Sequence, residues 1–366
     1  MIADQNRVSA SPAETFQTIV VGGGQAGLAA GHYLARQGKS FVILDENPRT
    51  GDAWRRRWDS LRLFTPSQLD GLPGMPFPQP KNYFPTKDEV ADYLEDYARQ
   101  FNLPVRHGVK VDGLSRNGRG YQITAGPARF SARQVIVSTG PFQRPHIPAF
   151  ARELAPEIFQ LHSSAYINPR QIRVKSVLVV GAGNSGAEIA LELAAAGKQV
   201  WLAGRDVGRT PATWPLSRLF DGRLTWWMMT NVLTVDTPPG RKMKAAVLHH
   251  GAPLGRARRK EVAEAGVILT PRLQGIEAGR PRLVDGRSLP VEGVIWATGF
   301  EPDYGWISLP IFDAEGYPRH ARGVAEGAPG LYFLGLMFQT RLTSALLGGV
   351  GRDAAYLTGQ LSQNGH

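Results

Sequence analysis

Two short apolar runs along the chain each end in glycines and lead into a helical pattern. The first run is QTIVVGGG at 17–24, and the second is SVLVVGAG at 176–183. An uninterrupted β-branched run of this length is typical of a parallel strand that is buried on both faces. After each run, over 25–37 and 184–196, apolar residues recur at helical spacing. The pattern therefore predicts a buried strand followed by an amphipathic helix, twice.

These two units share one register. We expect both helices to end at glycines, Gly38 and Gly197, which suit the left-handed position after a helix. A second apolar run follows each helix, at 40–45 and 199–204. The same offset separates four glycine pairs: Gly22 and Gly181, Gly24 and Gly183, Gly27 and Gly186, and Gly38 and Gly197. Two copies of one strand–helix–strand unit explain this spacing, so the predicted fold class is α/β with two Rossmann-like domains.

The rest of the chain predicts shorter elements. Thr86 begins an amphipathic pattern that ends near Phe101, and Glu89 completes a capping box with it, which predicts a helix. Short alternating runs with glycine turns at 105–137 predict a small β-meander. Residues 143–175 are typical of a connector.

Residues 206–260 are rich in Pro, Arg and Trp and carry an apolar cluster at 226–229, WWMM. We interpret this cluster as a buried packing helix. A substrate entrance or a surface that touches a membrane remains the alternative.

The paired glycines match the dinucleotide fingerprint G-x-G-x-x-G. The first glycine makes the tight turn, the second lets the backbone approach a pyrophosphate, and the third lets helix and strand pack closely. The pyrophosphate then lies at the helix N-terminus, where free N–H groups and the helix dipole favour anions. We expect cofactor contacts from Gly22, Gly24, Gln25, Ala26 and Gly27 in the first turn, and from Gly181, Gly183, Asn184, Ser185 and Gly186 in the second.

The residues at the end of the second strand of each unit indicate that the two units bind different dinucleotides. In the first unit it carries Asp45, followed by Glu46, and a carboxylate there accepts hydrogen bonds from a ribose diol and repels a 2′-phosphate. In the second unit it carries Gly204 and then Arg205, whose guanidinium can bind a 2′-phosphate in a forked geometry. An ordinary surface role for Arg205 remains the alternative. Since one dinucleotide must pass electrons to the other, we expect FAD in the first site and NADPH in the second.

Composition removes several classes of chemistry. The 366 residues include no cysteine, which excludes a disulfide framework, a redox-active dithiol and a thiolate-held metal cluster. No other pattern predicts a metal site, so redox chemistry must be carried by a bound organic cofactor. The net charge is +11, but the arginines are scattered, which suits an anionic cofactor better than a nucleic acid. With no apolar stretch of roughly 20 residues and no apolar leader, we expect no transmembrane segment and a cytoplasmic location.

Three segments carry a family resemblance. Residues 51–54 (GDAW), followed by RRRWDSLRLFTP, resemble the G-G-x-W segment of flavin-containing monooxygenases. Residues 138–140 (STG) and 297–300 (ATGF) resemble the two alanine-threonine-glycine linkers that join the domains of these flavoproteins. From about residue 17 to 358, the chain is similar to the bacterial CzcO-like flavoprotein monooxygenases and to the plant YUCCA enzymes.

This resemblance implies a two-dinucleotide-binding flavoprotein fold. A smaller NADPH domain, 166–290, would be inserted into an FAD domain made of 15–165 and 291–366, with 1–14 as a disordered tail. It also implies a reaction: NADPH reduces FAD, the reduced flavin and O2 form a C4a-(hydro)peroxyflavin, and one oxygen atom passes to a small organic substrate at nitrogen, sulfur or a carbonyl. The expected partners are therefore O2 and a small molecule, and a homo-oligomer is compatible with the resemblance.

Further cofactor contacts follow from the resemblance. Trp54 is expected to pack along the flavin, and Val111 to touch the adenine through a main-chain group. Thr343 and Ser344 would start the last helix, whose positive end would face the flavin pyrimidine; simple N-capping is the alternative for Thr343. The other expected contacts are Thr139, Gly140 and Gly335 for FAD, and Ala297, Thr298 and Gly299 for NADPH.

Two catalytic candidates lie where the chain departs from the family pattern. The family segment F-x-G-x-x-x-H-x-x-x-W/Y falls on Pro156, Ile158, His162 and Tyr166, so the histidine and the aromatic residue are kept. His162 is expected to be a hinge or a cofactor-positioning residue, with an ordinary hydrogen-bonded histidine as the alternative. Thr65 lies where animal relatives place an asparagine near the flavin, and its hydroxyl would either donate to the flavin peroxide or stabilise the turn before Pro66.

Two other functions stay open. Since the oxygenase segment is incomplete, one is an NADPH-dependent flavin reductase or oxidase that transfers no oxygen. The other is a redox-sensing regulatory flavoprotein, which would use the basic surface and the Trp-Met cluster.

Overall fold

The computed structural model describes residues 13–208, 221–250 and 254–363. The tail predicted at 1–14 lies outside these ranges except for Ala13 and Glu14, and Glu14 already starts the first strand. Its carboxylate forms an ion pair with Arg106 at 2.7 Å. The first domain therefore begins inside the segment that was predicted to be a tail.

A nine-stranded sheet forms the first domain within the described residues, in the order β16-β17-β18-β6-β1-β2-β3, with β5 also paired to β6 and β4 paired to β5. The strands β3, β2, β1, β6 and β18 run parallel, and β4 to β6 form the predicted antiparallel meander. The bounds are β1 (Glu14–Val21), β2 (Phe41–Leu44), β3 (Val105–Arg106), β4 (Gly113–Asn117), β5 (Gly120–Ala125), β6 (Ala128–Val137), β16 (His320–Ala321), β17 (Val324–Ala325) and β18 (Leu331–Phe333).

Both faces of this sheet are buried, as the apolar runs predict. Val20 packs into a core with the helices, whereas its neighbours Ile19 and Val21 pack into a second core with the meander and the loop around Tyr304. Successive side chains of a strand point to opposite faces, so an all-apolar run needs a cover on each side. The helices on the first face are α1 (Gln25–Arg36), α3 (Lys87–Gln100) and α8 (Val350–Gln363).

The helix predicted at 86–101 is confirmed together with its cap. Thr86 Oγ1 accepts from the Glu89 backbone N–H at 3.2 Å, and the Glu89 carboxylate accepts from the Thr86 N–H at 2.8 Å. The helices after each glycine fingerprint are also confirmed, and Gly38 and Gly197 adopt left-handed φ angles of 63° and 79°. These features depend on neighbouring residues alone, which is why local sequence predicts them.

Five parallel strands form the second domain within the described residues, in the order β11-β10-β9-β14-β8. Val177 and Val179 pack against the helices α4 and α7, while Leu178 and Val180 pack towards the β12–β13 hairpin. The bounds are β8 (Phe159–His162), β9 (Ser176–Val180), β10 (Gln199–Ala203), β11 (Ile268–Thr270), β12 (Leu273–Glu277), β13 (Arg280–Leu283), β14 (Gly293–Trp296), α4 (Asn184–Ala195) and α7 (Arg259–Glu264).

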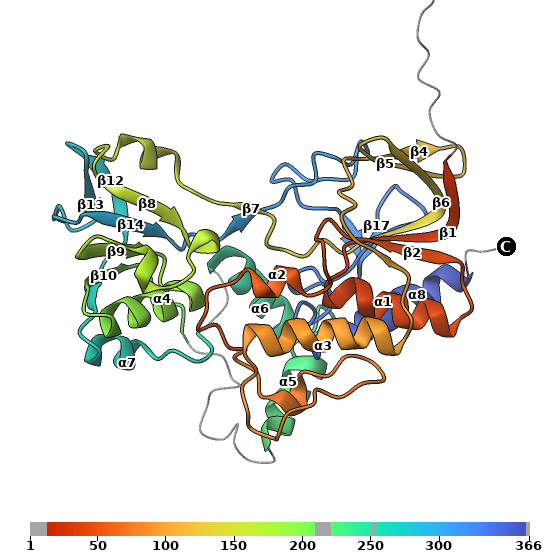
Figure 1. Ribbon diagram of the computed structural model, residues 1–366, viewed down its shortest axis with the longest axis horizontal. Helices are drawn as coiled ribbons and strands as arrows, with labels where there is room; N and C mark the ends of the chain where they lie inside the picture. The colour runs from red at the N-terminus through yellow and green to blue at the C-terminus, as the bar shows by residue number, and fades with distance from the viewer. Residues whose placement is uncertain (1–12, 209–220, 251–253, 364–366) are drawn as a thin grey trace, which may run out of the picture.

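The second domain is inserted into the first, but its predicted limits, 166–290, are too narrow. β8 and β14 both lie in the second sheet, because Gly293–Trp296 pairs with β9 on one side and with β8 on the other. The chain crosses between the domains where β7 (Arg144–Pro145) pairs antiparallel with β15 (Phe300–Glu301). Figure 1 shows β7 between the two lobes.

The least regular region contains two helices, α5 (Arg223–Asn231) and α6 (Pro238–His250), below the junction of the lobes in Figure 1. The Trp-Met cluster lies on α5, where Met229 is buried but Trp227 is 56% exposed. The prediction of a buried packing helix therefore holds for Met229 and is wrong for Trp227. Across the described residues, no helix is both long and apolar enough to pass through a membrane.

Candidate functional site

The first glycine turn has the geometry that the fingerprint predicts. Gly22 adopts a φ of 106°, and a Cβ there would lie 2.6 Å from the Ser138 carbonyl oxygen. A Cβ on Gly27 would overlap the Gly22 carbonyl oxygen, so the third glycine allows the close packing of helix and strand. By contrast, a Cβ on Gly24 would meet no atom within 4 Å. Gly24 caps α1 without a side-chain hydrogen bond, so this open face leads to free helix N–H groups.

The second turn repeats this arrangement. Gly181 adopts a φ of 109°, and its Cβ would overlap the Ala297 carbonyl oxygen. A Cβ on Gly186 would overlap the Gly181 carbonyl oxygen, whereas Gly183 faces open space at the start of α4. Each turn therefore has an open backbone face at the N-terminus of a 12-residue helix. That shape and polarity fit the pyrophosphate of a dinucleotide.

Asp45 lies at the end of β2, as predicted, and is buried. Its Oδ2 accepts from the Gly23 N–H at 2.5 Å, and its Oδ1 accepts from the backbone and side-chain N–H groups of Asn47, each at 2.7 Å. The carboxylate therefore holds the glycine turn against the strand, in addition to the ribose contact that the sequence predicts. Glu46 is exposed at the surface.

The corresponding end of β10 excludes an acid for a steric reason. A Cβ on Gly204 would lie 2.6 Å from the Ala182 backbone nitrogen, inside the second glycine turn. Any side chain at this position would therefore push the turn away from the strand. Arg205, the next residue, is exposed beside the turn, where the predicted 2′-phosphate would lie.

The linkers tie the two sheets to the turns. Ser138 Oγ donates within 3.0 Å to the carbonyl oxygens of Val21 and Gly22. Thr139 Oγ1 accepts from the Gln143 side chain at 2.9 Å, and Thr298 Oγ1 donates to the His146 carbonyl oxygen. The glycines that follow, Gly140 and Gly299, adopt φ angles of 75° and 84°, so both linkers turn sharply at the glycine.

His162 ends β8 and uses both ring nitrogens inside the protein. Nε2 lies 3.0 Å from the Gly299 carbonyl oxygen, and Nδ1 accepts from the Ser164 N–H at 3.1 Å. Its ring meets Phe300 edge-on at 5.2 Å, and burial lowers its pKa, so the ring is neutral near pH 7. Both ring nitrogens therefore have partners within the protein, which supports the predicted positioning role, since His162 anchors the second linker.

Trp54 and Gly335 border the first turn from two other segments. Trp54 Nε1 donates to Gln25 Oε1 at 3.2 Å, and Gln25 Nε2 donates to the Ala345 carbonyl oxygen at 3.2 Å. Gly335 packs on the first turn of α1, where a Cβ would lie 2.9 Å from Ala26. The segment from Gly335 to Ala345 therefore covers the start of α1. Val111 is half-buried in the segment between β3 and β4, and its adenine contact stays a prediction.

The last helix does not begin at Thr343. α8 starts at Val350, and Thr343 and Ser344 lie fully buried in the turns before it. Ser344 Oγ accepts from the N–H groups of Thr340 and Arg341, at 3.0 and 3.1 Å. Gly348 and Gly349 lie directly before α8, and Cβ atoms on them would overlap the carbonyl oxygens of Leu69 and Thr343. The positive helix end is therefore displaced from the predicted position.

Thr65 is buried, and its hydroxyl donates to Asp70 Oδ1 at 2.5 Å. In this structure the hydroxyl hydrogen is directed at the carboxyl group, which agrees with the structural alternative, and donation to a flavin peroxide stays a prediction. Asp70 was missed by the sequence analysis, because an aspartate in the segment LDGLPG is typical of a surface turn. Burial raises the pKa of Asp70 to about 8, and its Oδ2 has no hydrogen-bond partner among the described residues.

We expect Asp70 to make folding stability pH-dependent. Its pKa of about 8 lies above the ordinary value of 3.8, so between these values only the folded chain holds the proton. The free energy of unfolding should therefore fall as pH rises through this window, by up to about 1.4 kcal/mol for each pH unit. Asp70→Asn should flatten this slope and stabilise the protein at pH about 9 relative to wild type. Urea unfolding at several pH values measures the slope.

Thr65→Val provides the matched variant for this prediction. The Thr65 hydrogen bond lowers the pKa of Asp70, opposing burial, so its removal should move the transition to still higher pH. Equal slopes for wild type and Asp70→Asn would contradict the assignment.

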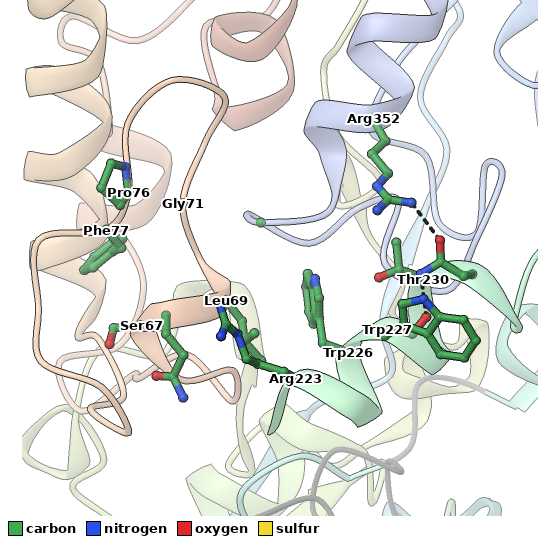
Figure 2. Close-up of a pocket in the computed structure, with 13 residues that line it drawn as sticks. Ser67, Leu69, Gly71, Pro76, Phe77, Arg223, Trp226, Trp227, Thr230 and Arg352 are labelled. Carbon is green, nitrogen blue, oxygen red and sulfur yellow. Dashed lines mark hydrogen bonds between the residues drawn. The ribbon is translucent and has the colours of Figure 1, made fainter. Parts of the chain in front are cut away.

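A cavity of about 450 Å³ lies near these residues. Its walls come from the segment 67–77, from α5 and from the region of Gly348 and Arg352. Figure 2 shows the ring of Trp226 between the 67–77 segment and Arg352, which reaches down from α8. The two tryptophans of the Trp-Met cluster line this cavity, and a substrate entrance at this place stays a prediction.

Comparison with known protein families shows to which family the chain belongs. Residues 19–218, more than half of the chain, match the model described as pyridine nucleotide-disulphide oxidoreductase. The chain belongs to this family. It does so without a cysteine, so its electrons cannot pass through a protein dithiol.

Individual relatives give a finer picture of the family. The chain is 41% identical to a CzcO-like oxidoreductase of Geobacillus kaustophilus, over 93% of this chain and 96% of that protein. It is 27% identical to the probable indole-3-pyruvate monooxygenase YUCCA9 of Arabidopsis thaliana, over 87% and 83% of the two chains. The solved flavin-containing monooxygenase of Stenotrophomonas maltophilia aligns with a TM-score of 0.76 at 28% identity, covering 96% and 99%.

These comparisons confirm the family resemblance and the Rossmann-like α/β fold. The chain is accordingly an oxidoreductase of the flavin monooxygenase type, with a flavin and a pyridine nucleotide as its cofactors.

Proposed function

We propose that this protein is an FAD- and NADPH-dependent monooxygenase that transfers one oxygen atom from O2 to a small organic substrate. The observation that carries the proposal is the pair of open glycine faces, Gly24 and Gly183, each at the end of a buried strand. Asp45 beside the first face suits a ribose diol, and Arg205 beside the second suits a 2′-phosphate. FAD therefore belongs to the first domain and NADPH to the second.

A cation at the junction between the domains supports the binding of an anionic cofactor there. Arg57 lies over the ring of Phe142 at 5.8 Å, and Phe142 in turn contacts Phe300 of the second linker at 5.3 Å. Burial lowers the pKa of Arg57, and no carboxylate of the described residues forms an ion pair with it. A desolvated cation of this kind is stabilised by a phosphate group.

The bound flavin would supply the O2 chemistry, and the chain would hold its partners and exclude water. The four electrons that O2 accepts come in equal parts from NADPH and from the substrate. One oxygen atom enters the substrate, and the other leaves as water. Gly22–Gly27 and Asp45 would bind FAD, Gly181–Gly186 and Arg205 would bind NADPH, and His162 would hold the second linker in place. Without a dithiol, the flavin itself must meet the final electron acceptor.

Rapid mixing tests the proposal against the reductase alternative. Protein loaded with FAD and reduced anaerobically by NADPH is mixed with O2, while the flavin absorbance and the H2O2 formed per NADPH are measured. An oxygenase should give a transient absorbance that matches neither oxidised nor reduced flavin, and less than one H2O2 per NADPH with a good substrate. Single-phase reoxidation with one H2O2 per NADPH for every substrate would overturn oxygen transfer and favour the oxidase.

A further inference from the structure

Residues 58–64 (WDSLRLF) belong to the first domain by their place in the chain, but they pack on the second. We call these residues the strap. Trp58 lies in the apolar core of the second domain, and Leu61 packs against the same core. That core also contains Ala187 of α4, the helix whose N-terminus carries the second glycine turn. The strap is therefore an apolar attachment of the first domain to α4.

Polar contacts add to this attachment. The Ser60 hydroxyl forms a hydrogen bond with the carboxylate of Glu192, which lies on α4. The Asp59 backbone N–H donates to the Ile167 carbonyl oxygen at 2.8 Å, and the Asn168 side chain donates to Asp59 Oδ2 at 2.7 Å. Side chain and main chain thus hold the start of the strap on the second domain.

The other end of the strap is bonded to the first domain. The Leu61 carbonyl oxygen accepts from the Lys87 N–H at 3.0 Å, where α3 begins, and the Leu63 N–H donates to the Pro85 carbonyl oxygen at 2.8 Å. The Leu63 side chain is buried in the core of the first domain. Within three residues, from Leu61 to Leu63, the strap therefore passes from one core to the other.

Phe64, the last residue of the strap, reaches the second glycine turn through a neighbouring loop. A Cβ on Gly255 would lie 2.5 Å from the Phe64 Cβ, so the two segments are in direct contact. The Gly255 N–H donates to Asn184 Oδ1 at 2.7 Å, and Asn184 is the first residue of α4. The strap therefore contacts the second domain both along α4 and beside its N-terminus.

The domains are otherwise joined by two linkers, which cross at the β7–β15 pair. Two adjacent chain crossings form a hinge, about which a domain rotates unless a further contact holds it. The strap attaches to α4, which is not part of either linker. It therefore supplies a third point of attachment, and three points fix an angle that two leave open.

We propose that the strap fixes the rotation of the second domain and thereby positions NADPH against the flavin. The proposal rests on the cofactor placement given under the proposed function. In this step NADPH gives two electrons and one proton to the flavin and leaves as NADP+, which requires the two rings to be held in contact. Trp58, Leu61 and Phe64 are positioning residues, because they act through α4 and its glycine turn.

Two leucines of the strap provide a matched pair of variants. Leu61→Ala weakens the contact with the second core, whereas Leu63→Ala makes the same truncation in the first core. We expect Leu61→Ala to lower the limiting rate of flavin reduction at saturating NADPH by about 10-fold. The Kd of NADPH should stay within about two-fold, since the glycine turn itself is unchanged. Leu63→Ala should reduce thermal stability more, because Leu63 is buried, yet keep the reduction rate within about two-fold.

A second pair acts from the opposite side of the contact. Gly255→Ala places a methyl group against Phe64 and should separate the strap from the second domain, again with an about 10-fold slower reduction. Gly275→Ala is its control, since a Cβ at Gly275 meets no atom within 4 Å and lies in the same domain. Anaerobic rapid mixing over a range of NADPH concentrations gives the limiting rate and the Kd separately. Reduction by dithionite should be equally fast in all four variants.

The spread of domain orientations is measured without any reaction. The chain has no cysteine, so Ser40→Cys in the first domain and Ala195→Cys on α4, both exposed, carry the only two nitroxide labels. Double electron–electron resonance on the full chain gives the distribution of distances between them. We expect the distribution to widen by roughly two-fold when Leu61→Ala or Gly255→Ala is added, and to stay unchanged with Leu63→Ala or Gly275→Ala.

The two measurements distinguish the strap from the proposed function. If NADPH does not reduce the flavin of the wild-type protein, the proposed function fails, and the distance distributions still decide whether the strap holds the domains. Unchanged distributions in both strap variants would overturn the proposal. So would a wider distribution with normal reduction, because orientation would then not limit the reaction. Slower reduction without a wider distribution also contradicts it, since the variant would then act on the cofactor site itself.

Discussion

A Gly24→Val variant is expected to purify without flavin, whereas Gly183→Val keeps its flavin but is no longer reduced by NADPH. Both glycines have a φ of −77°, which any residue adopts, and a Cβ at either meets no protein atom within 4 Å. The substitutions should therefore leave the fold intact and fill only the space proposed for each pyrophosphate. We expect each cofactor to bind at least about 100-fold more weakly.

The two variants act as controls for each other. Flavin absorbance per chain measures the first site, anaerobic bleaching by NADPH measures the second, and circular dichroism confirms folding. Equimolar flavin in Gly24→Val would contradict the first assignment. Loss of flavin from Gly183→Val alone would show that the two cofactors occupy the opposite domains.

The fingerprint glycines could be predicted from the sequence because the reasons that glycine is needed there lie within the turn itself. A positive φ at Gly22 and a helix packed on its carbonyl oxygen at Gly27 follow from the turn itself, so the spacing G-x-G-x-x-G specifies both. The same holds for the capping box of α3, where Thr86 and Glu89 bond to each other across one turn. Sequence reasoning succeeds where a residue and its physical cause lie within a few positions.

The features that the sequence did not predict involve contacts between segments far apart in the chain. β8 has four residues, FQLH, and is a strand only because β14, far along the chain, pairs with it. The segment before α8 is turned, and within it Gly348 packs against Leu69, a contact between distant segments. No periodicity in either segment carries that information.

The cavity was also beyond local reasoning. Phe77, Trp226 and Arg352 come from three separated segments, and each alone is an ordinary core or surface residue. Asp70 is similar, since the segment that carries it reads as an exposed turn until other parts of the chain cover it. Burial then converts an unremarkable acid into one whose pKa is raised to about 8.

Arg205→Gln is expected to lower the preference for NADPH over NADH by about 100-fold, because the guanidinium is the proposed partner of the 2′-phosphate. NADH lacks that phosphate, so its use should stay within about two-fold of wild type. Anaerobic bleaching rates measured against the concentration of each coenzyme give both constants. Arg173→Gln is the matched control, since it removes an exposed arginine of the same domain.

Gly204 explains why the second domain should not be converted to prefer NADH by introducing an acidic residue. An aspartate at this position would place its Cβ 2.6 Å from the Ala182 nitrogen, so Gly204→Asp should disrupt the second glycine turn and weaken both coenzymes together. Discrimination in the second domain therefore depends on what Arg205 attracts, because no acid can be placed there to favour the ribose diol. Equal weakening of NADPH and NADH in Arg205→Gln would contradict this account, since it would mean that Arg205 supports the turn and does not select the coenzyme.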